Sequence, residues 1–329
     1  MTDHRPLSDA FLDVFLAAAD AGQTMAFDRF MELALYHPEV GYYRSDRKRI
    51  GFEKGTDFFT ATTRSPVFGE LIIGACTELL QPRSVGEFSF VEVGAETAGG
   101  VLDGLAHPFA SVKTCRIGEP LQLAGPCVVF SNELFDAQPF RRFISRGNSW
   151  RELGVRCESS NLREVELPRL TDISPDLLPE APSGYIIDAP LAATALAREL
   201  AAQPWTGLFV ACDYGKSWRE LVEACPAGTA RAYHRHTQSN DLLARPGDQD
   251  ITCHICWDWL VEALKSHGFQ QPLVQSQESF FVRHAAEFIS QAVASEAQRF
   301  SSRKLSLLQL LHPAQLGQKF QVLHARRDE

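Results

Sequence analysis

Three apolar segments of the sequence each end in polar residues that are suited to ligand binding or proton transfer. These residues are Glu92 and Gly94 after FSFV, Asn132, Glu133 and Asp136 in VVFSNELFDAQP, and Asp213 and Tyr214 in LFVACDYG. A glycine directly after a strand allows the backbone to approach a nucleotide-like ligand, and carboxylates accept hydrogen bonds or protons. Together they predict one site, provided that the three segments belong to one sheet.

The segments that carry these residues have the composition of buried parallel strands. VVF and LFVAC contain almost no polar residue before the strand end, which is typical of strands covered on both faces. GYIIDA has a similar pattern, and helical patterns such as LAATALARELAAQ lie between the strands. The sequence therefore predicts an open, mostly parallel α/β sheet, in which ligands bind at the edge formed by the carboxyl ends of the strands.

Other regions have different periodicities. Residues up to about 82 are predicted to be helical, with one helix ending before Pro38. Residues 140–168 alternate polar and apolar side chains around an RGNS turn, which indicates antiparallel strands. Residues from Ala285 to about Leu311 are again predicted to be helical, and the strand-like KFQVLHAR follows them.

Composition excludes several classes of protein. The 329 residues are 45% apolar and 22% charged, as in globular domains, and the net charge of -9 argues against nucleic acid as a partner. No apolar run approaches the roughly 20 residues that span a bilayer, and FLDVFLAAA is predicted to be an amphipathic helix. The eight scattered cysteines suit a reducing compartment, so a cytoplasmic location is expected.

Seven motifs in chain order resemble those of the MidA-type methyltransferases, a bacterial and mitochondrial family that includes a complex I assembly factor. They are HPEVGYY, GTDFFTATTRSPVFGEL, SNELFDAQPFRRF, ACDYG, GTARAY with His236, ARPGDQDITCHI and LGQKFQVL. The resemblance implies a class I, S-adenosylmethionine-dependent methyltransferase fold. It implies a helical extension at residues 1–82 and a Rossmann-like core at residues 83–329 with a helical or loop insertion near 216–252. Because the mitochondrial member is a protein arginine methyltransferase, it also implies a protein substrate or partner, such as a respiratory-complex subunit.

The resemblance assigns roles to individual residues. Those implied to bind S-adenosylmethionine are Thr60, Glu92, Gly94, Glu119, Ser131 and Asn132, and those implied to be catalytic are Asn132, Glu133, Asp136, Asp213 and Tyr214. An amide beside a carboxylate could hold a guanidinium group in a forked, charge-assisted pair while its proton is removed.

The sequence departs from the family pattern at the first motif. Glu96 and Ala98 stand where the second and third glycines are expected, and Gly99 or Gly100 could replace them only if the loop were shifted. Only 38 positions separate Gly94 from Asn132, whereas a βαβ unit alone takes about 30 residues. We therefore expect a shortened sheet that lacks one helix and one strand, with Glu119 as the only acid near the expected ribose position.

These departures leave two functional hypotheses open. One is an active methyltransferase, and the other is a MidA-like pseudoenzyme that binds or assembles a partner without S-adenosylmethionine. An NAD-dependent oxidoreductase is a third hypothesis, and it rests only on the strand-glycine pattern.

Local alternatives exist for three motifs. Asn132 and Glu133 could instead cap a helix beginning at Leu134, and Thr252 could be a helix cap. The CHIC sequence at 253–256, with His234 and His236, could bind zinc or could contain buried thiols.

Overall fold

The computed structural model describes residues 7–43, 66–168, 173, 177–295 and 301–328. The chain forms two compact units, each assembled from three separate segments. Unit 1 comprises Met1–Phe58, Asp136–Ala195 and Lys216–Cys256, and unit 2 comprises Phe59–Phe135, Leu196–Gly215 and Trp257–Glu329. The chain therefore passes repeatedly from one unit to the other, and helix α5 (Leu191–Ala202) contains one of these passages.

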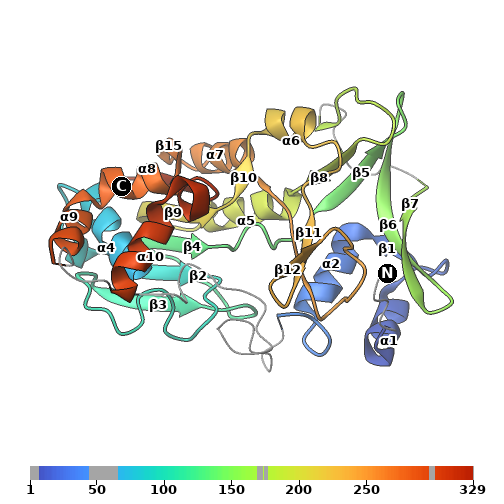
Figure 1. Cartoon of the computed structure of the whole chain (residues 1–329), viewed down its shortest axis with the longest axis horizontal. Helices are drawn as coiled ribbons and strands as arrows, with labels where there is room; N and C mark the ends of the chain where they lie inside the picture. Colours follow the sequence, from blue (N-terminus) through green and yellow to red (C-terminus); the bar gives the residue numbers. More distant parts are fainter. Residues whose placement is uncertain (1–6, 44–65, 169–172, 174–176, 296–300, 329) are drawn as a thin grey trace. The chain divides into compact units, whose positions relative to one another are not determined.

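Unit 2 is built on a six-stranded sheet with the order β15-β16-β9-β4-β2-β3. The strands are β2 (Ser89–Val93), β3 (Ser111–Cys115), β4 (Gly125–Asn132), β9 (Trp205–Asp213), β15 (Gln270–Ser276) and β16 (Gln321–Arg327). The four strands β3, β2, β4 and β9 are parallel and lie side by side in Figure 1. The last strand, β16, is inserted antiparallel between β9 and β15. The predicted sheet and the strand KFQVLHAR are both confirmed.

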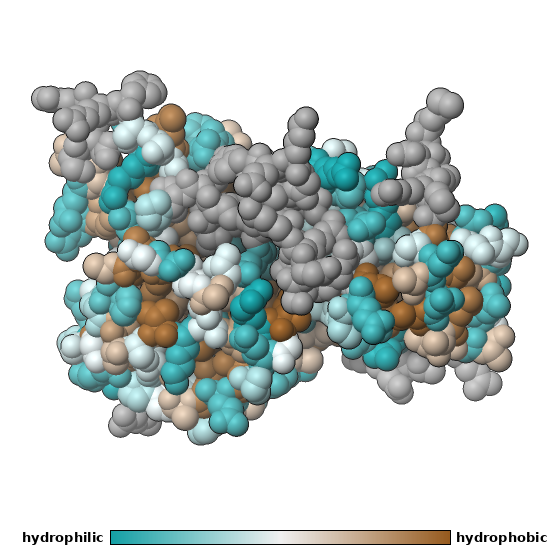
Figure 2. All heavy atoms as spheres, turned by 90° about the horizontal axis from the view of Figure 1, so that it is seen from below, coloured by the Kyte–Doolittle hydropathy of each residue, from teal (hydrophilic) through white to brown (hydrophobic). Residues whose placement is uncertain are grey.

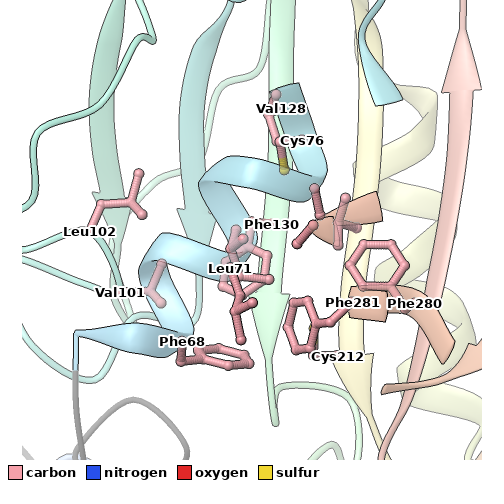
Figure 3. Packing of buried hydrophobic residues seen from close by; sticks show 14 of the residues in the cluster. Phe68, Leu71, Cys76, Val101, Leu102, Val128, Phe130, Cys212, Phe280 and Phe281 are labelled. Carbon is pink, nitrogen blue, oxygen red and sulfur yellow. The ribbon is translucent and has the colours of Figure 1, made fainter. Parts of the chain in front are cut away.

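Helices cover the sheet of unit 2 and bury its apolar side chains. They are α4 (Val67–Leu79), α7 (Trp257–Lys265), α8 (Gln277–His284), α9 (Ala286–Ser295) and α10 (Ser302–Leu311), with short turns η1 (Val85–Glu87) and η3 (Pro313–Gly317). Figure 3 shows Phe68 of α4 and Phe281 of α8 packed near Phe130 of β4, and all three side chains are fully buried. Burial of a large apolar side chain contributes about 2 kcal/mol, so this layer fixes α4 and α8 on the sheet.

Unit 1 contains a separate antiparallel sheet. Its strands are β1 (Thr24–Ala26), β5 (Arg141–Ser145), β6 (Trp150–Glu158), β7 (Asn161–Glu166) and β8 (Ile186–Ala189), and its helices are α1 (Asp9–Ala18), α2 (Phe27–Tyr36) and α6 (Trp218–Ala224). A second small sheet joins β11 (Arg231–His234), β12 (Thr237–Ser239) and β13 (Asp250–Thr252). Two short strands, β10 (Gly215–Lys216) and β14 (Ile255–Cys256), complete the described elements. The helix ending before Pro38 and the antiparallel strands at 140–168 are confirmed.

The strand GYIIDA corrects the sequence analysis. It forms β8, which pairs antiparallel with β5 in unit 1 and does not belong to the parallel sheet. Its terminal acid, Asp188, is buried and bonds to Arg142 at 2.5 Å through one oxygen. The other oxygen accepts the backbone N–H groups of Thr229 and Ala230 at 2.6 and 2.8 Å. Asp188 is thus a fully paired structural acid, as buried charges generally must be.

Several further expectations concern local structure. Thr252 lies in β13, so its interpretation as a helix cap is wrong. The thiol side chains of Cys253 and Cys256 are buried, and His234 Nδ1 lies 2.9 Å from the carbonyl oxygen of Asp248. Within the described residues, no helix is long and apolar enough to cross a membrane. In the view of Figure 2, the apolar side chains at the surface form separate patches among hydrophilic ones.

Candidate functional site

The carboxyl ends of four parallel strands form one edge of the sheet in unit 2. The register aligns Val93 of β2 with Cys115 of β3, Glu92 with Phe130 of β4, and Asn132 with Cys212 of β9. The residues that follow these strands therefore meet at the edge where ligands bind in open α/β sheets. We take this edge, with the loops that leave it, as the candidate site.

Gly94 forms a tight turn at the end of β2. Its φ angle is +78°, and an added Cβ would lie 2.6 Å from Cδ1 of Leu134. The N–H groups of Gly94 and Ala95 both donate to the carbonyl oxygen of Cys115, at 2.9 and 3.2 Å. Only glycine satisfies both the positive φ and the close approach, so this position of the first motif has the conformation that the sequence predicts.

Glu92 is a buried acid on the strand that leads into this turn. It is 6% exposed, and its Oε2 accepts the N–H of Val101 at 2.6 Å. Burial raises the pKa of Glu92 to about 7, although the hydrogen bond from Val101 lowers it. Keeping such a carboxylate charged at neutral pH costs free energy. Carboxylates with a raised pKa are frequent at functional sites.

The loop after Gly94 folds directly onto Glu92. Residues 95–105 form turns and no helix, and Val101 and Leu102 enter the hydrophobic core beside α4. Gly100 has a φ of +63°, and its added Cβ would lie 2.2 Å from Glu92 Oε2. Sequence reasoning left the role of this glycine open, and the adjacent pair Gly99-Gly100 was its only signal.

We predict that Gly100→Ala destabilises the protein more than Gly104→Ala does. Both glycines have positive φ, at +63° and +69°, so each substitution carries a backbone cost of about 1 kcal/mol. Gly104 has open space at its Cβ position, whereas Gly100 does not, which adds roughly 1–3 kcal/mol of overpacking. Urea unfolding midpoints of the two variants measure the difference. Equal midpoints would show that the loop does not rest on Glu92.

Along the chain, β3 is the only strand that occurs after β2 and before β4, and all of residues 94–132 are described. The predicted loss of a helix and a strand is confirmed. The turn after β3 brings Glu119 to the same edge as Glu92, and Glu119 Oε2 accepts the N–H of Arg116 at 2.8 Å. Glu119 is exposed, and Gly118 beside it has open space at its Cβ position. The structure therefore leaves the Glu119 side chain at the surface, next to open space.

Asn132 is the last residue of β4, and Glu133 follows it without beginning a helix. Asn132 Nδ2 donates to Glu133 Oε1 at 3.1 Å, and Glu133 N–H donates to the carbonyl oxygen of Cys212 at 2.9 Å. Glu133 has a φ of +49°, which is uncommon for a residue with a side chain. The interpretation of this pair as a helix cap is wrong, because residues 134–140 contain no helix. Residues held in sparsely populated backbone regions cluster at functional sites.

Asp213 holds the end of β9 against the segment that leaves β4. It is fully buried, and its two oxygens accept the N–H groups of Phe135 and Tyr214, at 2.9 and 2.8 Å. These bonds give Asp213 a positioning role. Tyr214 is half-buried, and its ring packs edge to face against Phe320 with the ring centroids 5.6 Å apart.

The remaining predicted residues lie in different places. Ser131 is buried in β4, next to Asn132. Asp136 belongs to unit 1, where it is buried and its carbonyl oxygen accepts the N–H of Cys253 at 3.0 Å. Thr60 lies outside the described residues. The structure thus brings Glu92, Gly94, Glu119, Ser131, Asn132, Glu133, Asp213 and Tyr214 to the sheet of unit 2, without Asp136.

The strand order and directions in unit 2 define a class I methyltransferase-like fold with one strand fewer. Residues 112–274, just under half of the chain, match the family model described as "putative S-adenosyl-L-methionine-dependent methyltransferase".

Two solved structures from Burkholderia thailandensis have the same fold. One is a COG1565 superfamily member that is described as a "likely methyl transferase" and is bound to S-adenosyl-homocysteine, and it superposes with a TM-score of 0.84. The other is a native structure of an uncharacterized protein of that superfamily, with a TM-score of 0.77. Each is 24% identical to this chain, and the alignment covers 96% of this chain and 91% of the other. No sequence among the curated proteins matches this chain.

Proposed function

We propose that this chain is an S-adenosylmethionine-dependent methyltransferase that modifies a nitrogen of a protein side chain, specifically an arginine guanidinium. The observation that carries the proposal is the sheet edge of unit 2. There the buried Glu92 and the Gly94 turn stand at the end of β2, and the Asn132–Glu133 pair stands at the end of the adjacent parallel strand β4. The matching family model and the solved structure with S-adenosyl-homocysteine support the same cofactor. The arginine acceptor is supported by the motif resemblance and by the chemistry of the Asn132–Glu133 pair.

The residues at this edge fit the cofactor in three respects. Glu92 offers a buried acceptor for the amino group, and the Gly94 turn presents backbone near the methionine part. Glu119 offers a carboxylate for the ribose hydroxyls, next to the open space at Gly118. Glu96 is the unfavourable feature, because a half-buried carboxylate at a glycine position would repel the cofactor carboxylate. When bound, the cofactor would supply a methyl group activated by the sulfonium charge.

Asn132 and Glu133 would handle the acceptor. The hydrogen bond from Asn132 Nδ2 fixes the Glu133 carboxylate, and the Glu133 backbone is held by Cys212. A fixed carboxylate accepts N–H groups of a guanidinium in a charge-assisted pair and takes up the proton that the nitrogen loses. Ser131 and Tyr214 would face the ligand at this edge, and Asp213 positions the ends of β4 and β9.

Calorimetric titration of the purified protein with S-adenosylmethionine and S-adenosylhomocysteine tests the proposal. We expect saturable binding of both, because Glu92, Gly94 and Glu119 remain in place. The absence of binding at millimolar ligand would overturn the proposal and favour a pseudoenzyme that binds a partner. Labelling of a lysate with radioactive methyl donor, followed by amino-acid analysis, tests the acceptor: methylarginine supports it, and methyllysine alone contradicts it.

A further inference from the structure

The segment LGQKFQV, residues 316–322, leads into the last strand of unit 2. Gln321 begins β16 and pairs in register with Asp213, the last residue of β9. The backbone of Phe320 is fixed on both sides, because its N–H donates to Leu316 and its carbonyl oxygen accepts from Gln277, at 3.1 and 3.0 Å. The segment thus places two defined side chains beside the DYG turn, residues 213–215.

The side-chain amide of Gln321 joins three parts of unit 2. Its Oε1 accepts the N–H of Gly215 at 3.1 Å and the indole N–H of Trp257 at 3.2 Å. Its Nε2 lies 3.4 Å from the carbonyl oxygens of both Gln318 and Lys319. The glutamine amide offers an acceptor on one side and donors on the other, which matches these contacts.

The DYG turn is therefore held from both of its neighbouring strands. Asp213 ties it to the segment after β4 through Phe135, and Gln321 ties it to β16 through Gly215. Tyr214 lies between these two anchors, and its ring meets Phe320 at an interplanar angle of 90°. Edge-to-face pairs of this kind add about 0.5–1.5 kcal/mol beyond burial, so Phe320 fixes the ring of Tyr214 as well.

We propose that Gln321 is a positioning residue that sets Tyr214 and Phe320 as an aromatic wall for the acceptor side chain. This inference rests on the proposed function, because it assigns the wall to the acceptor and not to the methyl donor. The wall lies at the end of β9, on the side of β4 opposite to Glu92 and Glu119 in the strand order. Tyr214 and Phe320 are each half-buried, and the face of an aromatic ring attracts a cationic group such as a guanidinium.

The test compares Gln321→Leu and Gln321→Glu with the unmodified protein. Leucine removes every polar contact of the amide, whereas glutamate keeps an acceptor for Gly215 and Trp257. Gln318→Leu is the matched control, because the Gln318 side chain bonds Glu278 and Ser276 and none of the DYG turn. Incorporation of fluorotyrosine gives a fluorine resonance for each of the six tyrosines, and Tyr214→Phe assigns that of Tyr214.

Three properties are measured for each protein. They are its affinity for S-adenosylhomocysteine, the fluorine NMR line of Tyr214, and the kinetics of methyl transfer to an arginine-containing peptide. Gln321→Leu is expected to leave the affinity unchanged, to shift or broaden the Tyr214 line, and to raise the peptide KM roughly tenfold with kcat little changed. Gln321→Glu is expected to restore the line and the KM, and Gln318→Leu to match the unmodified protein.

The outcomes separate this inference from the proposed function. An unmodified protein that binds no S-adenosylhomocysteine removes the proposed function and with it the acceptor wall, whatever the Tyr214 line shows. A protein that binds the ligand, while Gln321→Leu keeps both the Tyr214 line and the peptide KM, overturns the inference alone. A variant in which kcat falls and KM is unchanged also contradicts it, because the wall would then act on the chemical step.

Discussion

Glu133→Gln is expected to bind S-adenosylhomocysteine as the unmodified protein does, while methyl transfer falls by roughly a hundredfold to ten-thousandfold. Glutamine retains the shape of the side chain and a carbonyl oxygen for the hydrogen bond that Asn132 Nδ2 now makes at 3.1 Å. It cannot take up a proton, and it has no charge for a cationic acceptor. The loss should therefore appear in kcat, measured with a radioactive methyl donor at saturating concentrations.

The control for this variant is Glu262→Gln, which changes an exposed acid on α7 in the same unit. It should match the unmodified protein in both assays. Glu133→Gln that transfers methyl groups at the normal rate would remove Glu133 from the mechanism. Loss of ligand binding in Glu133→Gln would instead place this side chain against the cofactor.

The sequence predicts the parallel sheet well because its strands are uniformly apolar and end in polar residues. It does not distinguish two strands with the same pattern, however. GYIIDA and LFVACD both end an apolar run with aspartate, yet Asp213 bonds backbone N–H groups in unit 2 whereas Asp188 pairs with Arg142 in unit 1. Arg142 lies 46 positions before Asp188, so a local sequence pattern cannot identify the residue that pairs with Asp188 and thereby places β8 in unit 1.

The candidate site was predictable where residue type alone sets the geometry. Gly94 is an example, since its turn requires a residue without a side chain. The conformation of Glu133 was not predictable, because a positive φ in a residue other than glycine depends on the tertiary contact with Cys212. The need for glycine at position 100 was not predictable either, because it depends on how closely the loop packs against Glu92.

The loop at Gly100 also bears on the choice between an active enzyme and a pseudoenzyme. The family pattern expects glycines at 96 and 98, but the backbone here comes closest to the buried acid at Gly100 and Val101. The backbone thus contacts Glu92 a few positions later in the loop than the family pattern expects, and Glu92 stays next to the Gly94 turn. The departure at Glu96 is therefore compatible with a site that has changed its loop and kept its carboxylates.

Glu92→Gln is expected to stabilise the ligand-free protein at pH 8.5 while weakening its binding of S-adenosylhomocysteine. Burial raises the pKa of Glu92 to about 7, from an ordinary value near 4.5. The folded state then holds the proton more tightly than the unfolded state, so this contribution to stability is complete below about pH 4.5 and is lost as the pH rises through 7. Above pH 7 the raised pKa lowers the free energy of unfolding by roughly 3 kcal/mol relative to the value at low pH.

Glutamine removes this pH dependence and still accepts the N–H of Val101, which now lies 2.6 Å from Glu92 Oε2. Urea unfolding at pH 5 and pH 8.5 should show a gain in stability for the variant that is small at pH 5 and large at pH 8.5. Glu87→Gln, an exposed acid just before the same strand, should show no such trend. Equal effects of Glu92→Gln at both pH values would contradict the raised pKa.

Calorimetry on the same variant then shows why a costly buried acid is present. If Glu92 pairs with the amino group of the ligand, the unmodified protein gains more stability from S-adenosylhomocysteine than Glu92→Gln does. The difference in free energy of unfolding between the two proteins should then become smaller or change sign when the ligand is added at neutral pH. A variant that is more stable and binds the ligand equally well would leave Glu92 with only its structural bond to Val101, and the amino group would need another acceptor at this edge.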